Sequence, residues 1–167
     1  MRRTVRIAFG AALLVASTSL RAQNLGVEAS EFGARATAAS ARIGDHVDWG
    51  QPECGEPKYL AGTCVWKLGM DFSLTTNVLD RGTNAGLAIT RWQRFDLKDV
   101  SRRKVFDQTC RALVGALRPG WPAAKVVKFT LALIGSGRKD HEVTEGDVTF
   151  AFYTYPETII CQAQPTT

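Results

Sequence analysis

The stretch that most constrains the fold is 101–117, because its apolar residues recur with a helical period. Four of them follow one another at steps of four, three and four residues: Phe106, Cys110, Leu113 and Leu117. These steps place the four side chains on one face of an α-helix. Ser101 is a suitable N-cap, and Pro119 with Gly120 ends the helix. The pattern therefore predicts a helix whose apolar face another element must cover.

Segments on both sides of this helix alternate between apolar and polar residues, as strands do. The alternation predicts strands over 87–95, 125–134, 147–155 and 158–162. It also predicts either two strands, over 63–68 and 72–78, or one long bent strand across both. We expect 125–134 and 147–155 to pair as an antiparallel hairpin around a polar loop at 135–146. The expected fold class is α+β, an antiparallel sheet packed against one main helix.

The first 22 residues have the pattern of a secretory signal peptide. Arg2, Arg3 and Arg6 precede an apolar run over 7–16, and small or polar residues follow up to Ala22, where we expect cleavage. The apolar run is too short to span a bilayer, and the mature chain contains no longer one. We therefore expect an exported protein of the bacterial periplasm or exterior, without a transmembrane segment in its mature chain.

The net charge of +5 depends on this leader. Four of the 21 basic residues and none of the 16 acidic ones lie within 1–22, so the remaining chain has 17 basic and 16 acidic residues. A net charge of +1 gives no general attraction to polyanions, so nucleic acid is not an expected partner.

The chain has four cysteines, all beyond the leader: Cys54, Cys64, Cys110 and Cys161. An even number in an exported chain indicates two disulfides. Three pairings are possible, and we favour Cys54 with Cys64 and Cys110 with Cys161. The second pair would link the central helix to the last strand.

The mature chain of about 145 residues fits one domain. An Ala- and Ser-rich lead-in at 23–44 is either helical, over 30–43, or flexible. The α+β domain then occupies 45–167 and begins with an irregular loop at 45–62 that is rich in Gly and Pro.

A run of basic and aromatic residues between the third predicted strand and the helix is the first candidate binding site. Its members are Arg91, Trp92, Arg94, Phe95, Lys98, Arg102, Arg103 and Lys104. Guanidinium groups beside aromatic faces suit a phosphate, an acidic glycan or an acidic protein. A solvated strand end and helix entry, balanced by Asp96 and Asp99, is the plainer interpretation and the one we favour.

A group of hard oxygen donors with one imidazole is the second candidate, a metal site. It comprises Asp140, His141, Glu142, Glu145 and Asp147. Carboxylates of this kind bind divalent cations, but the spacing matches neither H-E-x-x-H nor an EF-hand loop. We favour a charged hairpin tip over a metal site and expect no cofactor.

His46, between Asp45 and Asp48, is the third candidate, since a carboxylate can orient an imidazole for acid–base chemistry. The sequence contains no accompanying nucleophile motif. A hydrolase that uses His46 or His141 with nearby carboxylates is therefore an alternative and not the favoured interpretation.

Trp121 lies between Gly120 and Pro122, in a predicted loop, and we expect it to be exposed and able to anchor a partner. The sequence as a whole favours a non-catalytic binding module, monomeric, with a protein or envelope component as its partner. An anionic ligand or glycan bound by the run at 91–104 is the further alternative.

Overall fold

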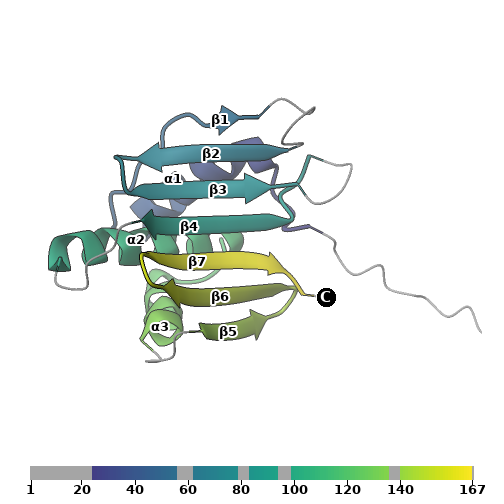
Figure 1. Cartoon of the computed structure of the whole chain (residues 1–167). Coiled ribbons are helices and arrows are strands. Elements are labelled where there is room, and N and C mark those ends of the chain that lie inside the picture. The colour runs from purple at the N-terminus through teal and green to yellow at the C-terminus, as the bar shows by residue number, and fades with distance from the viewer. Residues whose placement is uncertain (1–23, 56–61, 79–82, 94–98, 136–139, 167) are drawn as a thin grey trace, which may run out of the picture.

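The computed structural model describes residues 24–55, 62–78, 83–93, 99–135 and 140–166, and these ranges contain a seven-stranded antiparallel sheet. Its strand order is β1-β2-β3-β4-β7-β6-β5 (Figure 1). The strands are β1 (Glu53–Cys54), β2 (Thr63–Leu68), β3 (Phe72–Asn77), β4 (Leu87–Gln93), β5 (Asp140–Glu145), β6 (Val148–Tyr155) and β7 (Thr158–Pro165). The fold class is therefore α+β with an antiparallel sheet, as predicted.

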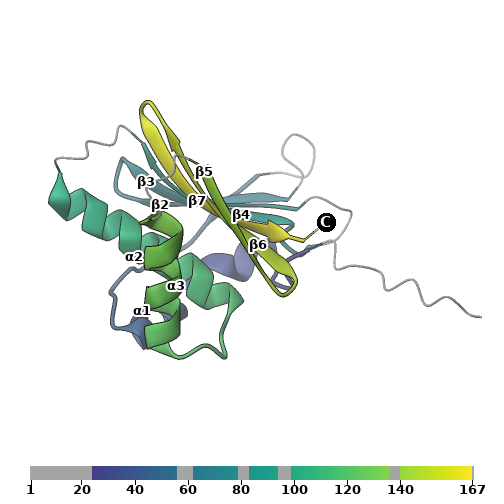
Figure 2. The same ribbon diagram turned by 90° about the horizontal axis from the view of Figure 1, so that it is seen from below.

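Three helices, not one, pack on the same face of this sheet (Figure 2). They are α1 (Phe32–Ile43), which follows a 3-10 turn at Ala29–Glu31, α2 (Val100–Leu117) and α3 (Ala123–Ile134). α2 contacts the central strands β4 and β7 and is flanked by α1 and α3. Within the described residues, no helix combines the length and apolar character needed to cross a membrane.

The predicted central helix is confirmed as α2, but its N-cap is Asp99 and not Ser101. The Asp99 carboxylate accepts a hydrogen bond from the Arg102 backbone N–H at 3.0 Å. The predicted apolar face is buried, and so are Ala112 and Gly115 on other sides of the helix. α2 is buried on several sides because it has the sheet on one side and two helices on the others.

The predicted strand at 125–134 is wrong, because these residues form α3. Val127, Phe129, Leu131 and Leu133 alternate in the sequence, but Leu131 is 54% exposed. The fully buried residues, Val126, Thr130 and Leu133, are instead spaced by four and three. Pro122 before the helix and Gly135 after it are helix boundary signals that supported this period over the alternation.

The hairpin partner of β6 is β5, which lies in the segment predicted to be a polar loop. β5 pairs with β6 from Asp140 opposite Tyr153 to Glu145 opposite Val148, and Gly146 turns with a φ of 61°. β5 is an edge strand whose residues are all partly or fully exposed. The sequence did not predict β5, because an exposed edge strand has no buried face and therefore needs no alternation of apolar and polar residues.

Aromatic side chains fill the space between α2 and the centre of the sheet. Phe106 of α2 lies 6.4 Å from Trp92 of β4 and 6.3 Å from Phe152 of β6, measured between ring centroids. Trp92 also stacks on Phe72 of β3 at 5.6 Å. Such ring pairs stabilise the core beyond their buried area.

Two disulfides link the chain, with the pairing favoured from the sequence. Cys54 and Cys64 lie opposite each other in β1 and β2. Cys110 of α2 and Cys161 of β7 are both fully buried, so this bond fixes the helix to the middle of the sheet. Closing a loop of this size contributes roughly 3–5 kcal/mol in the chain-entropy model.

The described part of the lead-in begins at residue 24 and contains α1. Of the two alternatives for this segment, a helix over 30–43 or a flexible chain, the helix therefore agrees with the structure. Phe32, Ala36 and Ala39 are buried on the face of α1 that packs inward. Gly33 lies directly under the indole ring of Trp66 on β2, where a Cβ atom would collide with the ring. This glycine allows α1 to approach the sheet closely.

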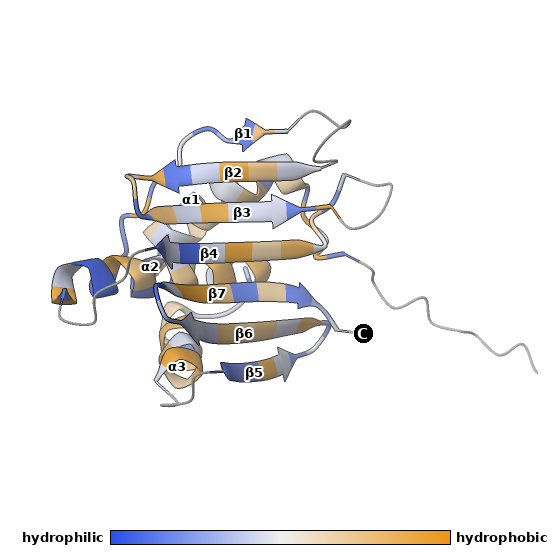
Figure 3. Cartoon of the chain, viewed as in Figure 1, coloured by the Kyte–Doolittle hydropathy of each residue, from blue (hydrophilic) through white to orange (hydrophobic). Residues whose placement is uncertain are grey.

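The face of the sheet opposite the helices is not covered by any described element. Even-numbered residues of β2, β3 and β4 point to the helices and are mostly buried, whereas odd-numbered ones point the other way. Figure 3 shows this alternation of hydropathy along the strands. The uncovered face is therefore mainly polar, as expected of an antiparallel sheet with one solvated face.

Gly33→Ala is expected to lower the free energy of unfolding by about 1–3 kcal/mol or more, because the added methyl group must displace the Trp66 ring. Urea denaturation followed by tryptophan fluorescence measures the change. Gly120→Ala is the matched control, since a Cβ there meets no atom within 4 Å. Equal stability of the two variants would contradict the close packing of α1 on Trp66.

Candidate functional site

The basic and aromatic run does not form one surface. Arg91 points to the uncovered face, whereas Trp92, one residue on, is fully buried among the core rings and cannot contact a ligand there. Arg102 and Arg103 lie at the exposed start of α2. Arg102 is already paired, at 2.7 Å from Asp71 and 3.3 Å from Asp99. Arg94, Phe95 and Lys98 fall outside the described residues.

Trp121 is not the exposed anchor expected from the sequence. Its ring is half-buried and meets Phe129 of α3 edge-on at 5.3 Å. The Lys125 ammonium group lies over the same ring, 3.8 Å from its centroid. The ring of Trp121 therefore packs against α3, the helix that begins two residues later at Ala123.

The five candidate metal ligands point in different directions. Asp140 and Glu142 are on the uncovered side of β5, whereas His141 faces the helices, with its Nδ1 3.1 Å from the Leu133 carbonyl oxygen. Glu145 pairs with Lys125, and Asp147 with Arg118. Among the described residues, no three His, Cys, Asp or Glu side chains converge in a way that would hold a metal ion.

Asp45 serves the packing of α2 and not the orientation of His46. Its two carboxylate oxygens accept hydrogen bonds from Arg111 at 2.7 and 2.9 Å, and Gln108 donates a third at 3.1 Å. Burial by itself raises the pKa of Asp45, but the hydrogen bonds from Arg111 and Gln108 and the charge of Arg111 outweigh it and leave this pKa lowered. His46 is exposed and makes no hydrogen bond to Asp45.

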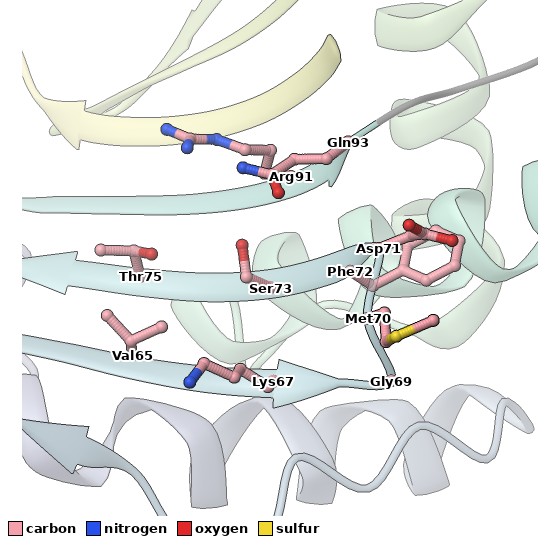
Figure 4. Close-up of a pocket in the computed structure, with 10 residues that line it drawn as sticks. All are labelled: Val65, Lys67, Gly69, Met70, Asp71, Phe72, Ser73, Thr75, Arg91 and Gln93. Atoms are coloured by element: carbon pink, nitrogen blue, oxygen red, sulfur yellow. The ribbon is translucent and has the colours of Figure 1, made fainter. Parts of the chain in front are cut away.

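The candidate functional site is a hollow on the uncovered face, with a volume of about 470 Å³. Three neighbouring strands form its floor, and the turn between β2 and β3 forms one end (Figure 4). The outward side chains of the strands are Val65, Lys67, Ser73, Thr75, Arg91 and Gln93. At the turn, the side chain of Met70 is 87% exposed. A volume in this range suits a small-molecule ligand or one unit of a larger one.

The strand register aligns the polar groups of the hollow in rows. Lys67 of β2 lies opposite Ser73 of β3, which lies opposite Arg91 of β4. Val65 and Thr75 form the next row. Ser73 of the middle strand therefore lies between two strands that each carry a cationic residue in the same row.

The acidic residues at this end of the sheet already have partners. Asp71 at the turn pairs with Arg102. Glu53 of β1 accepts a hydrogen bond from the Lys67 ammonium group at 2.9 Å, but both side chains are mostly exposed, at 75% and 61%. An exposed pair of this kind contributes little and exchanges readily with a ligand.

The polar side chains of the hollow are suited to hydrogen bonds and ion pairs. They comprise two cations, the Asp71 carboxylate, two hydroxyls and an amide, beside the apolar side chains of Val65, Met70 and Phe72. Of these, the sequence singled out only Arg91. The signal for the others was the polar set of outward positions at 67, 73 and 75, which becomes a site only when the strands are aligned.

A tyrosine pair continues the uncovered face beyond Arg91. Ile160 of β7 lies opposite both Arg91 and Tyr153 of β6, and the rings of Tyr153 and Tyr155 are 6.4 Å apart. The Tyr153 hydroxyl donates a hydrogen bond to the Glu142 carboxylate. This bond, with partial burial and nearby negative charge, raises the pKa of Tyr153 to about 12.

Comparison of the chain with protein-family models, with curated proteins and with solved structures gave no match.

Asp45→Asn is expected to lower the free energy of unfolding by about 3–5 kcal/mol at neutral pH, because it leaves the Arg111 charge buried without its partner. The folded pKa of Asp45 lies below its ordinary value of 3.8, so the pair stabilises above that value and is lost as pH falls through the folded pKa. Urea denaturation at neutral and acidic pH measures both effects, with exposed Asp48→Asn as the control. A stability that falls equally with acid in Asp45→Asn and wild type would contradict the role of this pair.

Glu142→Gln is expected to bring the pKa of Tyr153 down from about 12 toward its ordinary value of 10.0, because the charged acceptor of the hydrogen bond from its hydroxyl is removed. Titration of tyrosinate absorbance measures the shift, and subtraction of a Tyr153→Phe titration assigns it. Asp140→Asn should lower the same pKa by less. An unchanged titration in Glu142→Gln would show that this hydrogen bond does not control Tyr153.

Proposed function

We propose that this chain is an exported, non-catalytic binding protein of the bacterial periplasm or exterior. Its recognition surface is the hollow on the uncovered face of the sheet. The observation that carries the proposal is the alignment of cations, hydroxyls and an amide over three adjacent strands at one hollow. The signal-peptide pattern at 1–22 and the two disulfides support export.

The rigidity of the floor supports recognition by a preformed site. The inward residues beneath it, Trp66, Leu74 and Trp92, are fully buried, so the strands that present the outward groups are fixed by the core. A ligand that meets a preformed surface loses less conformational free energy on binding than one that must order its site. Functional groups on strands are also held more precisely than groups on loops.

Ser73→Trp is expected to abolish ligand capture, because an indole ring at the centre of the hollow fills it. The mature, oxidised protein is immobilised and exposed to bacterial envelope fractions, and the bound material is quantified by mass spectrometry. Thr144→Trp is the matched control: it lies on the same face but on β5, four strands away, or roughly 19 Å. Circular dichroism checks that both variants are folded.

Equal capture by wild type and Ser73→Trp would refute the hollow as the recognition surface. Turnover of peptidoglycan, peptide or phosphodiester substrates that is lost in His46→Ala or His141→Ala would refute the non-catalytic assignment and favour a hydrolase.

A further inference from the structure

Arg91 differs from the other partly buried arginines. Three described arginines are half-buried: Arg91, Arg111 and Arg118. Arg111 is held by Asp45, and Arg118 by Asp147 and the carbonyl oxygens of Leu117 and Glu145. The Arg91 side chain has no ion pair or hydrogen bond with any described residue, and its Nε is buried without an acceptor.

The Nε–H of Arg91 is withdrawn from water without an acceptor, which costs free energy. The rest of the guanidinium group is not buried in this way, and its charge is available to an anion from outside the chain. Arginine presents a planar set of donors that matches a carboxylate or a phosphate. Lys67 adds a second positive charge in the same register row, with Ser73 between them.

The groups around these two cations are suited to hydroxyls. Ser73 and Thr75 offer a donor and an acceptor each, and Gln93 offers an amide. Farther along the face, the neighbouring rings of Tyr153 and Tyr155 provide flat apolar surface with polar edges. Such a surface fits a sugar ring, which has hydroxyls at its rim and C–H groups on its faces.

The opposite end of the same face is acidic. Asp140 and Glu142 point outward from β5, three strands from β4 or roughly 14 Å from Arg91. Carboxylates at this distance repel a long polyanion laid across the sheet. The face therefore selects a short ligand with few charges over nucleic acid.

We propose that the hollow binds an acidic saccharide, whose carboxylate or phosphate pairs with Arg91 and whose hydroxyls meet Ser73, Thr75 and Gln93, with Lys67 as a second positive charge on the β2 side (Figure 4). The proposal rests on the binding function proposed above and specifies its ligand class.

Isothermal titration calorimetry with three probes tests this ligand class on the mature, oxidised protein. Galacturonic acid trimer carries the proposed chemistry, maltotriose is its neutral counterpart, and inorganic phosphate is an anion without sugar hydroxyls. We expect the acidic trimer to bind most tightly, with an affinity that falls as salt is added. The same titration with glucose 6-phosphate shows whether the site binds a sugar with a phosphate group or one with a carboxylate.

Arg91→Gln is expected to weaken binding of the acidic trimer by about tenfold or more, because a charge-assisted hydrogen bond is lost. Arg91→Lys keeps the charge without the planar donors and should lie between Arg91→Gln and wild type. Lys128→Gln, exposed on α3, is the matched control and should leave binding unchanged. Thermal unfolding of each variant checks the fold.

Equal affinity for maltotriose, equal affinity for inorganic phosphate, or an unchanged affinity in Arg91→Gln would each overturn the acidic-saccharide proposal, and so would absence of binding by all four probes. Capture from envelope fractions that is lost in Ser73→Trp but kept in Arg91→Gln would leave the binding function standing and refute only the ligand class. Capture unaffected by both variants would refute both.

Discussion

The packing of α2 against the centre of the sheet is the contact on which the other features depend. Phe106 lies between Trp92 and Phe152, and the buried Cys110–Cys161 bond fixes the same helix to β7. This contact decides which face of each strand points inward. Because successive strand residues point to opposite faces, burial of Trp92 requires Arg91 to point outward. The alternation of side chains along β4 thus places Trp92 in the core and Arg91 in the candidate site.

Electrostatics divide the molecule in a similar way. On the helix side, the buried charge of Asp45 is matched by Arg111, which ties the segment after α1 to α2. On the uncovered face, positive charge gathers over β2 and β4, at Lys67 and Arg91, and negative charge over β5. Among the half-buried arginines of the described residues, Arg91 alone has no ion pair or hydrogen bond with another of these residues. Its charge is therefore available to an anion from outside.

Much of the fold was predictable from residue patterns. The period of 101–117 predicted α2, the alternation at 63–68, 72–78 and 87–95 predicted β2 to β4, and the cysteines predicted the two disulfides. The pattern failed at α3, because a short apolar segment satisfies a period of two and a period of 3.6 at once. Of the candidate site, only Arg91 was identified, since its neighbours Ser73 and Thr75 are ordinary strand residues until the register aligns them.

The sequence by itself determined the local features: the apolar face of the central helix, the alternation of the central strands and the cysteines that pair. Each depends on residues close together in the chain or on chemistry fixed by the residue type. Only the tertiary structure decided which cations are paired and which face of the sheet stays uncovered. Asp45 and Arg111 are 66 positions apart, and the row Lys67, Ser73 and Arg91 joins three strands. Such contacts follow from the packing of distant segments, which spacing along the chain does not encode.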